Sequence, residues 1–132
     1  MRLHQSITTD VNLITACSGE RILVNNQPYM SSLIVTRETI TTDWRPTALT
    51  ELEDHDLDLV VALDPEVVLL GTGDHMAFPH PRVLAPLINN NIGVEVMDTQ
   101  AACRTYNILA AEGRQVAAAL ILEVAAPGLQ PS

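Results

Sequence analysis

A run of four apolar residues at 67–70, followed directly by Gly71-Thr72-Gly73, is the strongest structural signal in the chain. The run does not alternate with polar residues, which is typical of a strand that other elements cover on both faces. Beyond it the hydrophobic pattern predicts a helix from about 81 to 89, a strand at 94–97, a helix from 98 or 99 to about 112, and a strand at 115–122. Units of this kind favour parallel pairing of the strands.

Local signals support these boundaries. Pro81 suits a first helical turn, whereas Pro86 must lie in the first turn of its helix or kink it. The first helix is expected to end at Asn89-Asn90-Asn91 and the second at Gly113, because Asn and Gly tolerate the left-handed conformation in which helices commonly end. The strand at 115–122 is apolar on both faces, so we expect it in the centre of the sheet.

The N-terminal third has shorter apolar runs, at 13–16 and 22–24, with a Ser-Gly turn signal between them. A second turn at 25–28 precedes a longer alternating strand at 29–37. We therefore expect an antiparallel meander that widens the sheet. The predicted fold is an α/β domain over 1–124, with helices packed on a mixed central sheet, this meander and a β-α-β-α-β C-terminal half; residues 125–132 are expected to form a flexible tail.

A threonine-rich segment at 39–46 is predicted to be a loop, and it contains Trp44. A buried Trp that anchors the loop is favoured over a binding role, although both are open at this point.

Acidic residues are concentrated at 51–66, where three of them have the spacing that opens a calcium-binding loop: Asp54, Asp56 and Asp58. That loop also requires Gly at its sixth position and Glu at its twelfth, which here are Leu59 and Pro65. The pattern predicts a short helix with a solvated acidic face, and no metal site is expected.

Composition narrows the classes of partner. The chain has 132 residues and a formal net charge of −9, and all of its basic residues are Arg. This balance argues against nucleic acid and against an anionic membrane surface, both of which attract clustered positive charge. A basic protein surface or a neutral ligand is compatible with it.

Other sequence features predict a cytoplasmic protein that does not insert in a membrane. The N-terminus lacks the apolar core of a signal peptide, and no stretch approaches the roughly 20 apolar residues of a membrane span. Cys17 and Cys103 lie far apart in the sequence. Two such residues do not make a disulfide framework or a zinc site, and reduced thiols are expected.

The loop Gly71-Thr72-Gly73 is a candidate binding element, because glycines there allow a tight turn and a close approach by a ligand. It lacks the third Gly or Ala of the dinucleotide fingerprint, since Met76 occupies that position, and the chain has no Lys for a phosphate-binding P-loop. A tight turn packed on the next helix and a ligand cradle are both open.

The start of the last helix is the second candidate. Asp98 or Thr99 caps it, and free amides there could hold an anion with help from Arg104. The helix field is expected to lower the pKa of Cys103, and a nucleophile would need His75 or His80 as its base. A buried, unreactive Cys is the commoner case.

We therefore expect no catalytic or metal residues and no cofactor. Arg114 is expected to form a structural ion pair with Glu112 or Asp98. The candidate ligand-binding residues are Gly71, Thr72, Gly73, Asp98, Thr99, Cys103, Arg104, Asn107 and Arg114.

Four motifs in order, 69–73, 93–99, 102–109 and 112–114, resemble the domain-of-unknown-function family 498. The family includes uncharacterised bacterial and archaeal proteins, and its mitochondrial relatives include an assembly factor for respiratory complex I. The resemblance implies a three-layer α/β fold and no established catalytic residues. The chain looks like a bacterial member, because an Arg-rich, acid-poor targeting segment is missing.

Two functions from different classes follow. The leading one is a non-catalytic protein-interaction or assembly factor, which also self-associates if an apolar patch is exposed. The alternative is a small-molecule or anion-binding protein, which includes the case of an enzyme. Its pocket is expected between the glycine loop and the helix start at 98–104.

Overall fold

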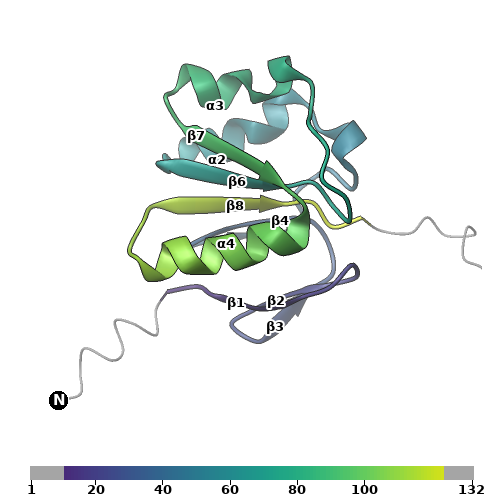
Figure 1. The fold of residues 1–132 in the computed structure, drawn as a ribbon, viewed down its shortest axis with the longest axis vertical. Coiled ribbons are helices and arrows are strands. Elements are labelled where there is room, and N and C mark those ends of the chain that lie inside the picture. Colours follow the sequence, from purple (N-terminus) through teal and green to yellow (C-terminus); the bar gives the residue numbers. More distant parts are fainter. Residues whose placement is uncertain (1–10, 124–132) are drawn as a thin grey trace, which may run out of the picture.

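The computed structural model describes residues 11–123, which form two sheets, with helices packed on both faces of the larger one (Figure 1). A small sheet contains β1 (Ile14–Cys17), β2 (Ile22–Val24) and β3 (Gln27–Tyr29). The large sheet, in the order β5-β4-β8-β6-β7, contains β4 (Leu33–Thr36), β5 (Ile40–Thr41), β6 (Val67–Gly71), β7 (Gly93–Met97) and β8 (Val116–Leu120). The helices are α2 (Asp58–Ala62), α3 (Ala85–Asn89) and α4 (Thr99–Ala111), with 3-10 turns η1 (Leu49–Glu51), η2 (Asp54–Leu57) and η3 (Pro81–Leu84).

The large sheet is mixed, as predicted. β6 pairs in parallel with both β7 and β8, and β8 pairs antiparallel with β4. All residues of β8 are buried, which confirms its central position. Its run of three alanines keeps the strand thin, so the layers above and below can approach it closely.

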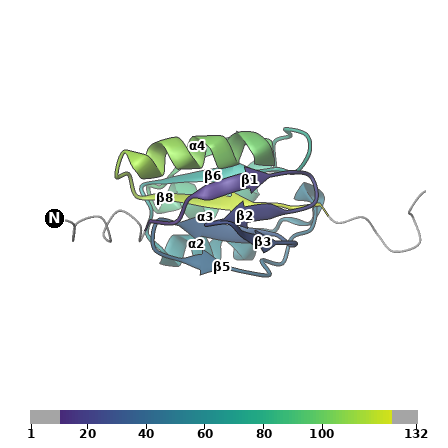
Figure 2. The same cartoon turned by 90° about the horizontal axis from the view of Figure 1, so that it is seen from below.

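Alternate residues of the central strands face two separate cores. Leu69 and Ala118 pack with α4 and the small sheet on one face, whereas Val68 and Ala119 pack against α2 and α3 on the other. Figure 2 shows α4 on one side of the large sheet and α2 on the opposite side. The fold is therefore the predicted three-layer α/β arrangement, in which the small sheet shares a layer with α4.

The N-terminal meander widens the central sheet only in part, because β1, β2 and β3 form a separate sheet, whereas β4 pairs with β8 in the large one. The expected long strand at 29–37 is broken in two: Tyr29 ends β3 and Leu33 begins β4. Ser32, in the break, donates its hydroxyl to the carbonyl of Pro46 and accepts from the amide of Leu122, so local bonds replace strand pairing there. Pro28 lies in β3, at the edge of the small sheet, where its missing N–H group does no harm.

The segment around Trp44 is only partly the predicted loop, since β5 lies within it. Trp44 is buried, and its indole N–H donates to the carbonyl of Asp56 at 3.0 Å, which confirms the anchoring role. The acidic face predicted next to it is not wholly solvated. Asp56 is only 6% exposed and receives two hydrogen bonds from the guanidinium of Arg45.

The helix boundaries follow the sequence signals. Asp98 caps α4 by accepting from the amide of Ala101 at 2.8 Å, and Gly113 follows the helix with φ of 85°. Asn91 has φ of 60° after α3, and Pro86 lies in the first turn of that helix. No helix in the described part of the chain is long and apolar enough to cross a bilayer. The tail predicted at 125–132 lies outside the described residues.

Asp56→Asn tests the ion pair between the buried Asp56 carboxylate and the half-exposed Arg45 side chain. The guanidinium of Arg45 holds the pKa of the Asp56 carboxyl below its ordinary value of 3.8. A depressed carboxyl pKa adds stability above the ordinary pKa, and that stability is lost as the pH falls through the folded-state pKa. We expect the variant to lower the free energy of unfolding by about 2 kcal/mol at pH 7, and the difference from wild type to shrink below about pH 4.

Urea unfolding at several pH values measures this effect. Asp54→Asn is the matched control, because Asp54 lies in the same turn with its side chain 63% exposed. It should shift the unfolding free energy by less than about 0.5 kcal/mol. Equal shifts for the two variants would show that the Arg45 pair is not stabilising.

Candidate functional site

The glycine loop lies at the carboxyl end of β6 and is bound to the start of α4. The amide of Gly73 donates to the Thr99 hydroxyl at 2.8 Å, and that hydroxyl donates to the carbonyl of Ile121 at 2.7 Å. The amide of Thr99 donates back to the carbonyl of Gly73, and the amide of Ile121 donates to the carbonyl of Gly71. One buried threonine thus ties together the ends of β6 and β8 and the first turn of α4.

Gly71 and Gly73 lie so close to neighbouring residues that a side chain at either position would collide with them. A Cβ atom at Gly71 would lie 2.9 Å from the Thr99 hydroxyl and 3.0 Å from its Cα. Gly73 has φ of 106°, and a Cβ there would lie 2.7 Å from the carboxyl carbon of Glu123. The contacts that the glycines make are therefore contacts with the protein itself, as in a tight turn packed on the following helix.

A small hollow of about 190 Å³ lies beside this loop. Its lining includes the carboxylates of Asp74, Asp98 and Glu123. Asp98 is occupied as the cap of α4, and Glu123 accepts from the amide of Asp74 at 3.0 Å. Three carboxylates around one hollow oppose an anion electrostatically, and Arg104 is not part of the lining.

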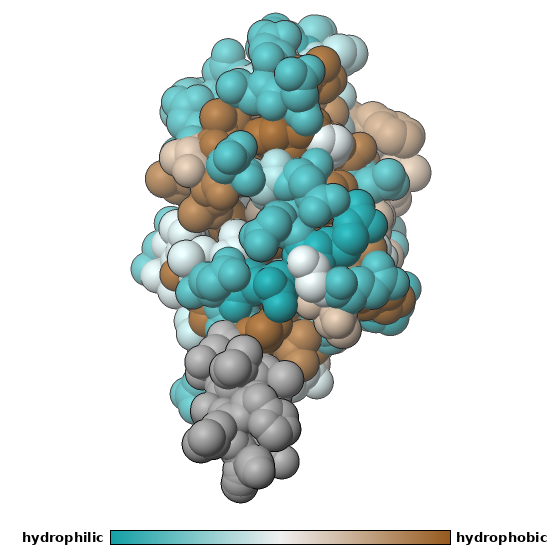
Figure 3. Space-filling view, turned by 90° about the vertical axis from the view of Figure 1, so that its left-hand side faces the viewer, coloured by the Kyte–Doolittle hydropathy of each residue, from teal (hydrophilic) through white to brown (hydrophobic). Residues whose placement is uncertain are grey.

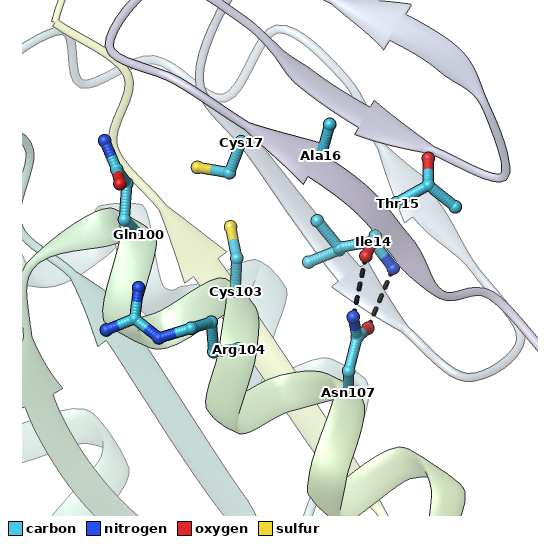
Figure 4. A pocket seen from close by; sticks show the side chains of 8 residues that line it. All are labelled: Ile14, Thr15, Ala16, Cys17, Gln100, Cys103, Arg104 and Asn107. Atoms are coloured by element: carbon cyan, nitrogen blue, oxygen red, sulfur yellow. Dashed lines mark hydrogen bonds between the residues drawn. The ribbon is translucent and has the colours of Figure 1, made fainter.

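A second pocket, of about 270 Å³, lies between β1 and α4 (Figure 4). Asn107 holds the two elements together: its side-chain carbonyl accepts from the amide of Ile14 at 2.8 Å, and its NH2 group donates to the carbonyl of Ile14 at 2.6 Å. The side chain thereby acts like a neighbouring strand for one residue of β1. The preceding residue of α4, Tyr106, donates its hydroxyl to the carbonyl of Asn12.

Cys17 and Cys103 meet in this pocket, which sequence separation gave no reason to expect. Figure 4 shows Cys17 on β1 and Cys103 on α4 with their sulfur atoms turned toward each other. The neighbouring Cys103 thiol lowers the pKa of Cys17. The proximity of Cys17 and burial raise the pKa of Cys103, contrary to the expected lowering by the helix field. Cys103 is 3% exposed, and neither His75 nor His80 lines the pocket.

The predicted site residues thus separate into three places. Gly71, Thr72, Gly73, Asp98 and Thr99 meet at the end of the sheet, as the expected parallel pairing of β6 and β7 requires. Cys103, Arg104 and Asn107 line the pocket on β1. Arg114 lies at the other end of β8 and pairs with Glu66 at 3.0 Å, not with Glu112 or Asp98.

A third hollow, which the sequence did not indicate, is a groove of about 790 Å³ along β7. Phe78, Leu84 and Ile88 line one side of it, and residues 92–96 line the other. Within residues 11–123, β7 pairs only with β6 and forms one edge of the large sheet. The exposed Glu95 between two half-buried valines is the sequence signal for an edge strand. No cluster of three or more His, Cys, Asp or Glu side chains in the described residues could hold a metal ion.

Comparison with known proteins identifies the class and then the family. A solution structure from Bordetella pertussis described as an Mth938-like domain matches 96% of this chain and 96% of its own, with a TM-score of 0.79 and 30% identity. A Xanthomonas campestris protein solved by NMR matches with a TM-score of 0.79 and 38% identity over 100% of this chain and 97% of its own. The chain is therefore a small α/β domain of the Mth938-like class. It belongs to the family of proteins of unknown function DUF498/DUF598, whose profile matches residues 14–121.

A curated relative has a named role. NADH dehydrogenase (ubiquinone) 1 alpha subcomplex assembly factor 3 of Bos taurus is 32% identical over 110 residues, which are 82% of this chain. The match covers 59% of the bovine protein, so the chain spans less than two thirds of that relative. These matches confirm the predicted family and its assembly-factor relatives.

Gly71→Ala tests the close packing at the end of β6. We expect a loss of about 2 kcal/mol in the free energy of unfolding, because the contacts with the Thr99 backbone and Leu120 leave no room for a methyl group. Thermal and urea unfolding measure the loss. Gly93→Ala is the control, since a Cβ there meets atoms only at 3.5 Å and beyond, and it should change stability by less than about 0.5 kcal/mol. An unchanged Gly71→Ala variant would contradict this role.

Proposed function

We propose that the chain is a non-catalytic protein-interaction or assembly factor, and that it holds its partner protein in the groove along β7. The observation that carries the proposal is an edge strand whose outer side pairs with nothing in residues 11–123 and is bordered by exposed apolar side chains. The named role of the bovine relative supports an assembly function, and the respiratory complex is the partner class that this resemblance suggests.

The backbone of β7 supports strand addition. Its inner side pairs with β6 from Gly93 to Met97 in unbroken register. The N–H and C=O groups on its outer side then have the spacing that an extended segment of a partner could pair with. Main-chain bonds of this kind supply affinity, and pockets for alternate side chains supply specificity.

The apolar side of the groove supplies such a pocket. Phe78 is 75% exposed and Ile88 is 60% exposed, although both are large and apolar. Figure 3, which views the molecule from the left-hand side of Figure 1, shows apolar residues gathered in the upper half of this face, the part that carries α3 and β7. Exposed apolar patches rimmed by polar residues are typical of protein-binding surfaces.

Charge restricts the partner. The net charge is −9, and Glu95 lies in the middle of the open edge. Charge complementarity favours a partner segment that carries Arg or Lys beside its apolar residues. The same negative charge disfavours a nucleic-acid partner. The compartment that we propose for the interaction is the cytoplasm.

The alternative, a small-molecule or anion-binding protein with its site at 71–73 and 98–104, has weaker support. The amide of Gly73 and the hydroxyl of Thr99 are bonded to the protein, and the adjoining hollow is acidic. An anion there would have to displace these bonds or approach three carboxylates.

Site-specific photocrosslinking in the native cells tests the docking surface. A photoreactive aromatic residue in place of Phe78 should crosslink one defined protein, and Ile88→Ser in the same chain should reduce the crosslink at least about tenfold, since the apolar pocket is lost. Position 30 is the control, because Met30 is 61% exposed and lies away from the groove lining. A probe there should give no such product.

Analytical ultracentrifugation of the purified chain distinguishes a partner from self-association. The proposal expects a monomer when the chain is alone and a crosslinked product of another protein in cells. A dimer that Phe78→Ser dissociates would show that the groove holds a second copy. Equal crosslinking from positions 30 and 78 would overturn the docking site.

A further inference from the structure

We propose that Cys17 and Cys103 are an oxidisable dithiol, a modification site at which an oxidant closes an intramolecular disulfide between β1 and α4. This inference does not depend on the proposed docking function. It rests on the placement of two thiols from opposite ends of the chain in one pocket, where both are free in this structure.

The arrangement divides the two thiols into different roles. Cys17 is half-buried on the edge strand β1, next to the pocket of about 270 Å³, so a small oxidant can reach it. Cys103 is 3% exposed and lies directly behind it, with its sulfur turned toward that of Cys17 (Figure 4). An accessible attacking thiol with a buried resolving thiol is the arrangement that favours an internal disulfide over further oxidation.

The surroundings also favour reaction at Cys17. The neighbouring Cys103 thiol lowers the pKa of Cys17, which favours the thiolate form of Cys17. Arg104 acts in the same direction on Cys17, whereas burial and the carboxylates of Asp98 and Asp74 oppose it. The thiolate is the nucleophilic form, so Cys17 is the first thiol to react.

The reaction balances with a peroxide as the oxidant. The Cys17 thiolate attacks one peroxide oxygen, the O–O bond breaks, and the products are a sulfenic acid and water once the leaving oxygen has taken a proton. The Cys103 thiol then attacks the Cys17 sulfur, loses its proton, and expels a second water. Two thiols are oxidised to one disulfide, and one peroxide is reduced to two waters.

The disulfide would reinforce an existing contact. β1 is held to α4 by the Asn107 amide and the Tyr106 hydroxyl, which bond to the backbone of Ile14 and Asn12. Cys17 lies on the same strand, so the disulfide can form without any movement of the small sheet to a new position on α4. The link would close a loop of roughly 85 residues and restrict the unfolded chain strongly.

The test uses the whole purified chain, first reduced and then exposed to hydrogen peroxide or to glutathione redox buffers from mostly reduced to mostly oxidised. Peptide mapping without reductant should find Cys17 joined to Cys103, and intact mass should show the loss of two hydrogen atoms. The melting temperature of the oxidised chain should rise by roughly 10 °C, and reductant should reverse the rise.

Two variants assign the roles. In Cys103→Ala, a sulfenic-acid probe such as dimedone should label Cys17 after peroxide treatment, because the resolving thiol is gone. In Cys17→Ser, where the altered side chain is only half-buried, Cys103 should remain unlabelled and the melting temperature should not respond to oxidant.

Wild-type mapping keeps the proposal testable even if one variant fails to fold. Persistence of both free thiols in the oxidised buffers would overturn it. Glutathione attached to Cys17 without an internal disulfide, or a dimer joined through Cys17, would overturn it as well. Each of these outcomes leaves the groove experiment unaffected, since the groove lining does not include either cysteine.

Discussion

The structure depends on the close approach of α4 to the carboxyl ends of β6 and β8. The hydroxyl of Thr99 accepts from Gly73 and donates to Ile121, so one buried side chain fixes two strand ends and a helix start. The approach is possible because Gly71 has no side chain beneath Thr99. Disturbing this hydrogen-bonded junction lowers the stability of the fold, because it leaves buried polar groups without a hydrogen-bond partner. The first turn of α4 therefore has a single position, and the length of the helix then lies across the sheet.

Fixing α4 in this way separates the two sides of the molecule. On one side α4 shares its layer with the small sheet, and side chains such as Asn107 bind the edge of β1 as a strand would. At the β7 edge of the large sheet, nothing in residues 11–123 pairs with the outer side of the strand. The edge of β1 in the small sheet is thus bonded to side chains of α4, whereas β7 keeps its outer backbone groups and the apolar Phe78 available. This asymmetry is the physical basis for assigning docking to β7 and thiol chemistry to the β1 pocket.

Local sequence patterns predicted those elements whose helix, strand and capping signals all lie within a few consecutive residues. The apolar run at 67–70, the cap at Asp98 and the stop at Gly113 are each determined within a few residues, and each agrees with the structure. The strands of the meander were predicted, but β1, β2 and β3 form a separate sheet and β4 alone of them joins the central one. Strand pairing is a choice among partners far apart in sequence, and alternation alone carries no information about that choice. The burial of Asp56 escaped prediction for the same reason, since its partner Arg45 lies on another segment.

The amino-acid sequence by itself determined the order and type of the C-terminal elements, the central place of β8 and the family, because periodicity, capping and motif order are properties of contiguous residues. It also placed the glycine loop beside the start of α4, because parallel strands bring their carboxyl ends to one edge. Only the tertiary structure decided which of the candidate residues meet. It separated Arg114 from the rest, opened the groove on β7 and brought Cys17 against Cys103. Contacts between distant segments depend on how the layers pack in three dimensions, and that packing is a property of the whole core.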